Sequence, residues 1–166
     1  MTTPDVRPYE PRDGAALGAI LEQVFRAGDT YTIDHDISRE DALAYWTGGE
    51  RQVFSAIVDG RLHGSYYIVR NQQGGGSHVC NCGFVTDPMT RGKGIARTML
   101  AHALQTARDA GFRAMQFNFV VSTNTRAVGL WEKAGFEIVG RLPAAFEHPE
   151  KGYVDALVMY KTLVAD

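Results

Sequence analysis

One short glycine-rich stretch has the residue types and spacing to hold a pyrophosphate. It consists of Arg91, Gly92, Lys93, Gly94, Ile95 and Ala96, between a strand-like segment and an amphipathic helical pattern. A helix N-terminus exposes unpaired N–H groups and partial positive charge, and glycine lets the backbone approach an anion closely. Arg91 and Lys93 add charge at the same place. The alternative is a plain helix cap, because two-glycine turns before helices are common.

Length and composition predict one globular domain over residues 1–166. The chain has 166 residues, 45% hydrophobic and 22% charged, which is enough to bury a single sizeable core. A net charge of -2 supplies no broad basic surface, which argues against nucleic acid or a membrane as partner. No apolar run approaches the roughly 20 residues that span a bilayer, and the first residues are not a signal peptide. We therefore expect a cytoplasmic protein.

The two cysteines are expected to be reduced thiols. Cys80 and Cys82 stand two apart in a strand-like run, where their side chains point the same way and a mutual disulfide would be strained. No further ligands at suitable spacing accompany them, so no metal site is expected.

The first half of the chain is predicted to alternate between helices and strands. The hydrophobic pattern predicts a strand over 6–9, a helix over 15–27 capped by Asp13, a loop over 28–37 and a helix from Ser38 to Trp46. The dipeptide Asp59-Gly60 favours a tight turn, so residues 53–58 and 62–69 are predicted to form a β-hairpin.

The second half continues this alternation. We expect a strand over 78–86, a helix after the glycine stretch that ends at Gly111, a strand over 114–121, a helix over 124–134, and strands over 136–141 and 154–160 joined by a loop over 142–153. Helices interleaved with strands in this order indicate a mixed α/β sheet with helices on both faces.

These residues together resemble the GNAT superfamily of acetyl-CoA-dependent N-acyltransferases over nearly the whole chain. The phosphate signature of the superfamily is matched by Arg91, Gly94 and Ala96. Its second signature is matched by Asn124-Thr125-Arg126-Ala127, Leu130 and Glu132-Lys133-Ala134-Gly135-Phe136. The resemblance implies acetyl-CoA as cosubstrate and the GNAT fold, a mostly antiparallel mixed sheet of seven strands whose fourth and fifth strands splay apart at a bulge.

The resemblance also implies a set of cofactor contacts. The phosphates would lie on the N–H groups of Gly92 to Ala96, and a backbone N–H near Val85 would stabilise the oxygen of the tetrahedral intermediate. Further contacts with the cofactor are expected from Phe84, Val85, Asn124, Trp131 and Lys133. Plain core packing is the preferred alternative for the side chains of Phe84 and Val85.

Position 131 departs from the commonest pattern of the superfamily, in which a tyrosine protonates the departing thiolate. Trp131 stands there instead, and an indole N–H does not release a proton at neutral pH. Water, the ammonium proton of the substrate or another residue would have to serve. We interpret Trp131 as a wall of the thioester channel.

Segments 77–84, 117–124 and 154–156 resemble acetyltransferases that act on the proline analogue azetidine-2-carboxylate. This resemblance implies that Asn81 and Asn118 hold an amino acid and that Asn124 lies near the thioester, with Asn118 and Asn124 as catalytic residues. An amide can accept from an amine and donate to a carboxylate. Alternatively, Asn81 and Asn118 satisfy bulged backbone groups and Asn124 is a helix N-cap.

Two loops are candidates for covering the site. Tyr31 in the loop over 28–37 is predicted to contact the substrate, whereas Asp34, His35 and Asp36 are interpreted as solvated. In the loop over 142–153, aromatic residues would line the pocket or form a contact within a homodimer.

The sequence thus predicts acetyl transfer to a small-molecule amine, an amino acid or toxic analogue, by direct attack in a ternary complex. No covalent nucleophile is placed, because Cys80 and Cys82 lie upstream of the expected thioester position. Acetylation of a peptide N-terminus is one alternative. A non-catalytic acyl-CoA-binding module is another, supported only by Trp131.

Overall fold

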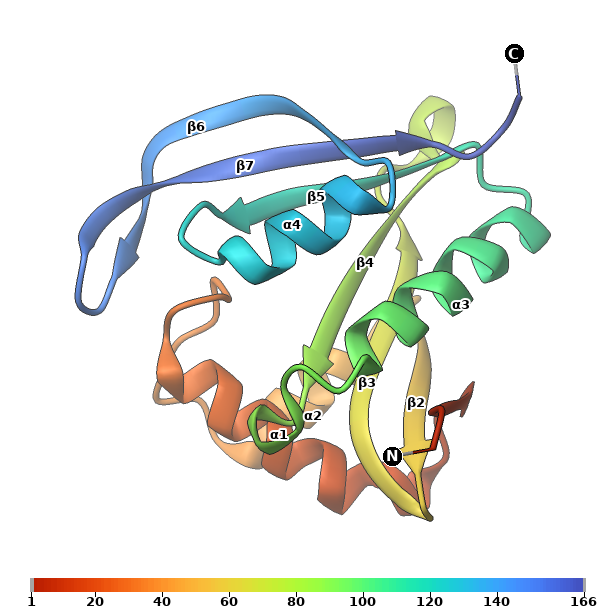
Figure 1. The fold of residues 1–166 in the computed structure, drawn as a ribbon, viewed down its shortest axis with the longest axis vertical. Coiled ribbons are helices and arrows are strands. Elements are labelled where there is room, and N and C mark those ends of the chain that lie inside the picture. The colour runs from red at the N-terminus through yellow and green to blue at the C-terminus, as the bar shows by residue number, and fades with distance from the viewer. Residues whose placement is uncertain (1, 166) are drawn as a thin grey trace.

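A seven-stranded mixed sheet forms the centre of the structure, a computed structural model that describes residues 2–165 (Figure 1). Its strands are β1 (Asp5–Pro8), β2 (Gln52–Val58), β3 (Arg61–Arg70), β4 (Val79–Thr86), β5 (Ala114–Val121), β6 (Glu137–His148) and β7 (Gly152–Thr162). They lie in the order β1-β2-β3-β4-β5-β7-β6, and only β4 and β5 pair in parallel. The predicted mixed, mostly antiparallel sheet is confirmed.

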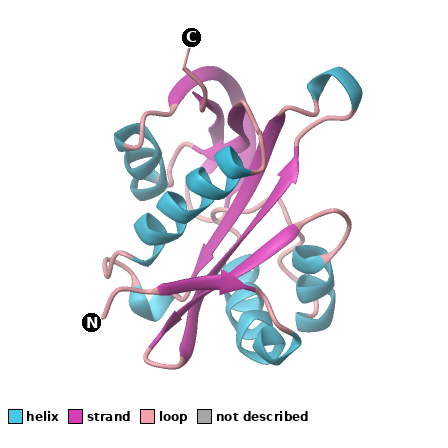
Figure 2. Cartoon of the chain, turned by 90° about the vertical axis from the view of Figure 1, so that its right-hand side faces the viewer, coloured by secondary structure: helices cyan, strands magenta, loops and turns pink. Residues whose placement is uncertain are grey.

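Helices cover both faces of this sheet, as predicted (Figure 2). They are α1 (Gly14–Ala27), α2 (Arg39–Thr47), α3 (Ile95–Asp109) and α4 (Thr125–Lys133), with single 3-10 turns at Pro11–Asp13, Gly74–Gly76 and Pro88–Thr90. Helices α1 and α2 bury Phe25 and Trp46 against Tyr67 on one face. On the opposite face, Met99 of α3 and Trp131 of α4 belong to a second buried cluster. No helix within residues 2–165 is long and apolar enough to cross a membrane.

Local sequence signals set several helix ends. The Ser38 hydroxyl accepts a hydrogen bond from the Asp41 N–H at 3.0 Å, which caps α2 as predicted. Gly111 follows α3 with φ of 86°, the left-handed backbone expected of a residue that ends a helix. The predicted loop over 28–37 does separate α1 from α2.

Asp13 does not cap α1, so that prediction is wrong. Its carboxylate instead accepts hydrogen bonds from the Arg7 guanidinium at 2.8 and 2.9 Å, the Ser55 hydroxyl at 2.9 Å and the Glu10 N–H at 2.9 Å. The side chain is buried, and these donors hold its pKa at about 2, below the ordinary value of 3.8. The Asp13 carboxylate therefore bonds to residues of β1 and β2 instead of capping the N–H groups at the start of α1.

The predicted loop over 142–153 is also wrong, because β6 and β7 continue as a long hairpin through most of it. The pairing jumps from Leu142 opposite Ala156 to Phe146 opposite Val154, which leaves an extended bulge in β6. The Asp155 carboxylate holds this bulge by accepting from the Ala144 N–H and the Arg141 guanidinium, both at 2.9 Å. Pro143, Ala144 and Ala145 lie in this bulge.

Replacing Asp13 by Asn is expected to lower the free energy of unfolding by about 2 kcal/mol at neutral pH, the equivalent of its pKa shift. A depressed carboxyl pKa stabilises the fold above the unfolded value of 3.8, and this contribution is lost as the pH falls toward about 2. Urea unfolding measures the free energy of unfolding of both proteins. The difference between the two values should therefore shrink as the pH falls from 3.8 toward about 2. The exposed control Asp109→Asn should change stability by only a few tenths of a kcal/mol.

Candidate active site

The candidate site lies where β4 and β5 separate (Figure 1). The two strands pair only at Val79 with Ala114 and at Cys80 with Met115. Farther along, β5 carries a bulge between Phe117 and Val120 in its pairing with β7. The predicted splay of the fourth and fifth strands is therefore present. Beyond Cys80, no strand within residues 2–165 pairs with the edge of β4 that faces β5.

Asparagine and glutamine side chains gather where the strands part. The Asn81 amide donates to the Gln116 carbonyl oxygen at 3.0 Å, so it continues the ladder for one step beyond the last backbone pair. Asn118 donates to the Asn71 side-chain oxygen at 2.6 Å and accepts from the Gln116 side chain at 2.9 Å. We call Asn71, Asn81, Gln116 and Asn118 the amide network.

The amide network includes both predicted substrate asparagines and two residues that sequence reasoning missed. Asn81 does satisfy a backbone group, as one alternative predicted, and Asn118 instead bonds to other side chains. Asn71 comes from the end of β3 and Gln116 from β5, so they meet only in the folded sheet. The one feature of the sequence that could have indicated them is that both carry a side-chain amide, as the predicted strand asparagines do.

The register of β3 and β4 decides which backbone groups are free. The Asn71 N–H donates to the Val79 carbonyl, and the Asp87 N–H to the His63 carbonyl, both at 2.8 Å. In a regular antiparallel ladder every second residue of a strand bonds to the same neighbouring strand. Val85 lies an even number of residues from both Val79 and Asp87, so it also directs its N–H toward β3. The register therefore does not support the N–H of Val85 itself as the oxyanion donor predicted near this residue, and the Val85 side chain is buried in the core.

The residues between these positions have their backbone groups on the open side. Cys82, Phe84 and Thr86 direct N–H and C=O toward β5, beyond the point where the strands part. One of these positions already has a side-chain partner, because the Tyr31 hydroxyl donates to the Phe84 carbonyl oxygen. Backbone donors for a ligand on this edge are thus the N–H groups of Cys82, Phe84 and Thr86.

Tyr31 ties the loop between α1 and α2 to the open edge of β4. Its ring packs edge-on against Phe25 and Trp46, with centroids 5.2 and 6.1 Å apart. Burial raises the pKa of the Tyr31 hydroxyl well above its ordinary value, so the group stays protonated at neutral pH. The hydroxyl therefore remains the hydrogen-bond donor to the Phe84 carbonyl oxygen, and its contact with a substrate stays a prediction.

The glycine stretch forms an open cradle at the start of α3. Gly92 and Gly94 have φ of 80° and 79°, and a Cβ added at either would meet nothing within 4 Å. Gly94 is the N-cap of α3 and supplies no capping side chain, so the first N–H groups of the helix are left for a ligand. Arg91 and Lys93 are exposed on either side of Gly92. This arrangement fits a pyrophosphate.

Aromatic rings close the gap between the strands on the α3 and α4 face. Trp131 is 8% exposed, and its ring centroid lies 5.1 Å from that of Phe84 and 4.7 Å from that of Phe117. Trp131 thus packs against rings from both β4 and β5, and its interpretation as a wall of the thioester channel stays a prediction.

Two further predicted contacts lie on α4. Asn124 is its N-cap, because the side-chain oxygen accepts from the Ala127 N–H at 3.4 Å. This capping role was the alternative prediction for Asn124, and its amide NH₂ is not used by the cap. Lys133 is exposed in the last turn of the same helix.

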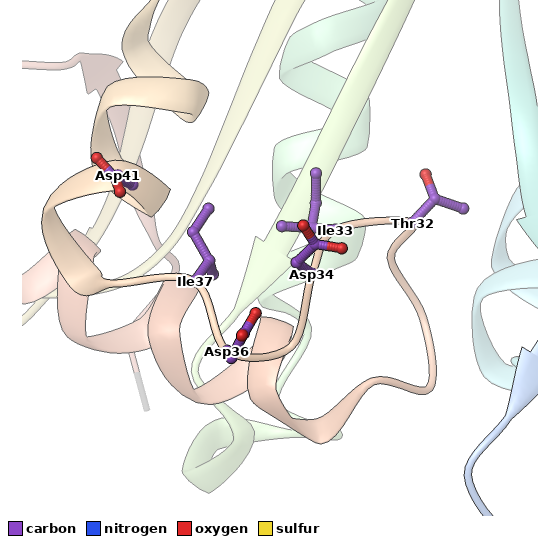
Figure 3. Close-up of a pocket in the computed structure, with 6 residues that line it drawn as sticks. All are labelled: Thr32, Ile33, Asp34, Asp36, Ile37 and Asp41. Atoms are coloured by element: carbon purple, nitrogen blue, oxygen red, sulfur yellow. The ribbon is translucent and has the colours of Figure 1, made fainter.

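A separate hollow of about 420 Å³ lies in the loop before α2 (Figure 3). It is lined by Thr32, Ile33, Asp34, Asp36, Ile37 and Asp41. Asp34, His35 and Asp36 are exposed, in agreement with their interpretation as solvated side chains. Within residues 2–165 there is no group of three or more His, Cys, Asp or Glu side chains placed to hold a metal ion.

Comparison with known proteins identifies the family. Residues 20–136 match the Acetyltransferase (GNAT) family. N-acetyltransferase aca1 of Schizosaccharomyces pombe is 32% identical over 161 residues, a match covering 87% of this chain and 77% of the relative. A GCN5-related N-acetyltransferase from Kribbella flavida has a TM-score of 0.91 at 36% identity, covering 96% of this chain and 98% of that one.

A phosphinothricin acetyltransferase from Sinorhizobium meliloti, solved in complex with acetyl-CoA, has the same fold. Its TM-score is 0.84 at 19% identity, with 97% of this chain and 89% of that one covered. The family match over residues 20–136 includes β4, β5 and the glycine cradle. The chain therefore belongs to the GNAT family of acetyltransferases and is an N-acetyltransferase.

Proposed function

We propose that the protein transfers the acetyl group of acetyl-CoA to the amine of a small molecule, an amino acid or amino acid analogue. The observation that carries this proposal is the position of the open β4 edge. The glycine cradle follows this strand directly, and the amide network begins where the strand leaves β5. A thioester held along the edge would therefore lie within reach of an amine held by the amides.

The donor half of the site supplies a phosphate anchor, a backbone edge and an oxyanion donor. The first N–H groups of α3, together with Arg91 and Lys93, suit the pyrophosphate of acetyl-CoA. Backbone groups of Cys82 and Phe84 suit the amides of the pantetheine arm. An N–H of Phe84 or Thr86 would stabilise the tetrahedral oxygen, a contribution of roughly 3 kcal/mol in comparable enzymes.

Direct attack of the amine on the thioester fits the state of the cysteines. Cys80 and Cys82 are both free and buried, and burial raises the pKa of the Cys82 thiol. The Cys82 thiol is therefore not a ready thiolate nucleophile at neutral pH, and Cys80 is fully buried. The Trp131 indole cannot supply a proton to the departing thiolate, so we assign that proton to the substrate ammonium, relayed by water.

The amide network is the proposed acceptor site. Asn118 has one remaining N–H and one remaining acceptor position beyond its bonds to Asn71 and Gln116. These suit an amine that must be held while it loses a proton. Asn81 would position the acceptor beside the open edge, while Asn124 would bring its free NH₂ toward the thioester.

Replacing Gly94 by Glu is expected to weaken acetyl-CoA binding at least about 100-fold, because the carboxylate would repel the phosphates and occupy the cradle. Isothermal titration calorimetry would measure this loss. Gly111→Glu is the matched control, since Gly111 has φ of 86° and open space around it. Both variants should lose about 1 kcal/mol of stability from left-handed strain, but only the first should lose binding. Unchanged affinity in Gly94→Glu would refute the cradle assignment.

Replacing Asn118 or Asn81 by Ala is expected to lower kcat/KM for the acceptor roughly 100-fold, since the amine loses a hydrogen-bonding partner. Release of free thiol from acetyl-CoA would be followed with proline analogues, other amino acids, polyamines and peptides. The exposed amide variant Gln105→Ala should behave as the unchanged protein. Turnover confined to peptides would favour an N-terminal acetyltransferase, and no turnover with intact acetyl-CoA binding would favour a non-catalytic module.

We also propose that the protein forms a homodimer through the β6–β7 hairpin. This edge of the sheet exposes four large apolar side chains: Ile138 (42% exposed), Val139 (58%), Leu142 (39%) and Tyr153 (71%). Light scattering should give twice the mass of the 18.2 kDa chain, and Val139→Asp should give the monomer mass. A weak dimer has a dissociation constant of about tens of micromolar. If the unchanged protein has the monomer mass at such a concentration, this proposal is contradicted.

A further inference from the structure

A short turn joins the end of β4 to the glycine cradle, and Asp87 supplies the acceptors that hold this turn (Figure 1). One carboxylate oxygen, Oδ1, accepts from the Met89 N–H at 3.0 Å and caps the 3-10 turn Pro88–Thr90. The Asp87 carbonyl oxygen accepts from both the N–H and the hydroxyl of Thr90, at 2.9 Å each, and Thr90 is buried. Asp87 therefore bonds to the middle and to the end of the turn.

The hydrogen bonds of this turn continue into the cradle. The Thr90 carbonyl oxygen accepts from the Lys93 N–H at 3.3 Å. Gly92 and Gly94 flank Lys93, have a left-handed backbone and have open space at the position of a Cβ. Glycines without packing partners have many accessible conformations. The conformation of the cradle therefore depends on the bonds at its two ends, which are the Asp87 turn and the first turn of α3.

Asp87 is itself held by β3. Its N–H donates to the His63 carbonyl oxygen at 2.8 Å, and its second carboxylate oxygen, Oδ2, lies 3.7 Å from the His63 Nδ1. This Nδ1 atom is buried and has no hydrogen-bond partner within residues 2–165. An imidazole that carries its hydrogen on Nδ1 can donate it to a carboxylate, so a small approach of the two groups would give the buried nitrogen a partner.

The side chain of His63 comes from a β-bulge. The pairing of β2 with β3 jumps from Ala56 opposite Gly64 to Ile57 opposite Leu62, which leaves His63 as the extra residue. Bulges are frequent next to active sites, where they redirect a side chain. In this bulge the redirected side chain meets the residue that begins the cradle turn.

We propose that Asp87 and His63 are positioning residues for acetyl-CoA. The Oδ1 cap, and the contact of Oδ2 with His63, keep the cradle in the conformation that receives the pyrophosphate. Neither residue touches the reacting atoms. This inference rests on the proposed assignment of the cradle to the pyrophosphate. Loss of the Asp87 carboxylate lowers the population of the binding-competent cradle and weakens acetyl-CoA binding by the same factor.

Asp87→Ala should raise the Kd of acetyl-CoA about 10-fold, as expected for loss of an N-cap. Calorimetry measures this Kd and needs no acceptor. With an amine that the enzyme acetylates, kcat at saturating acetyl-CoA and the KM of that amine should not change. S-acetylpantetheine, a donor without pyrophosphate, gives a readout that a general loss of stability would not leave constant. Its kcat/KM should be the same in the variant and in the unchanged protein.

Three further variants separate the two residues and control for stability. Asp87→Asn keeps an acceptor for the Met89 N–H, so its Kd should stay within about threefold of the unchanged value, and it serves if the alanine variant does not fold. His63→Ala should raise the Kd about threefold alone but have no effect together with Asp87→Ala, because it acts through the carboxylate. Ser38→Ala is the matched control, since it removes a similar cap at α2 and should not change acetyl-CoA binding.

An unchanged Kd in Asp87→Ala would overturn this inference, and so would an equal loss of kcat/KM with S-acetylpantetheine. Equal losses in Asp87→Asn and Asp87→Ala would contradict the role of the Oδ1 cap. An effect of His63→Ala that persists without the Asp87 carboxylate would contradict the role of the pair. Full affinity in Gly94→Glu would refute the cradle assignment and this inference with it, whereas a loss there without a loss in Asp87→Ala would overturn this inference alone.

Discussion

The separation of β4 from β5 is the constraint on which the rest of the site depends. Two paired positions hold the strands together, and beyond them the backbone N–H and C=O groups on this side of β4 face no strand in the described part of the chain. Unpaired backbone groups in a protein interior are costly, so a native structure must give them partners. Asn81 supplies an amide at the point of separation, and the Tyr31 hydroxyl bonds to Phe84 farther along. The remaining groups are available to a substrate.

The alternation of a β-strand separates the two halves of the proposed reaction. The side chains of Cys82 and Phe84 pack with α3 and α4, on the face that carries Trp131. Val85 packs with α1 and α2, on the face where Tyr67 covers Gly83. Backbone groups of the same strand lie between these faces and point toward β5. One strand thus separates an aromatic wall from the face proposed to receive the acceptor, while its edge serves the thioester.

Local patterns predicted the elements whose signals lie within a few residues of one another. The Ser38 cap, the turn at Asp59-Gly60 and the stop at Gly111 all depend on the conformation of single residues, and all are present. The predictions that were wrong concern segments whose hydrogen bonds go to partners on other elements of the fold. Asp13 bonds to Arg7 and Ser55 rather than to the helix beside it, and the bulge of β6 depends on Asp155 from β7. Neither partner could be known from spacing alone.

The sequence by itself determined the order of helices and strands, the glycine cradle and the family, because periodicity, backbone freedom and motif spacing are properties of neighbouring residues. Only the tertiary structure decided which groups of β4 are free, since that depends on the register with β3, which directs the Val85 N–H toward β3 rather than toward the open edge. It also brought Asn71 and Gln116 to Asn118, and placed the Arg51 guanidinium against the rings of Tyr45 and Tyr67. Pairing of amides and charges is decided by neighbours in space, which the order of residues does not specify.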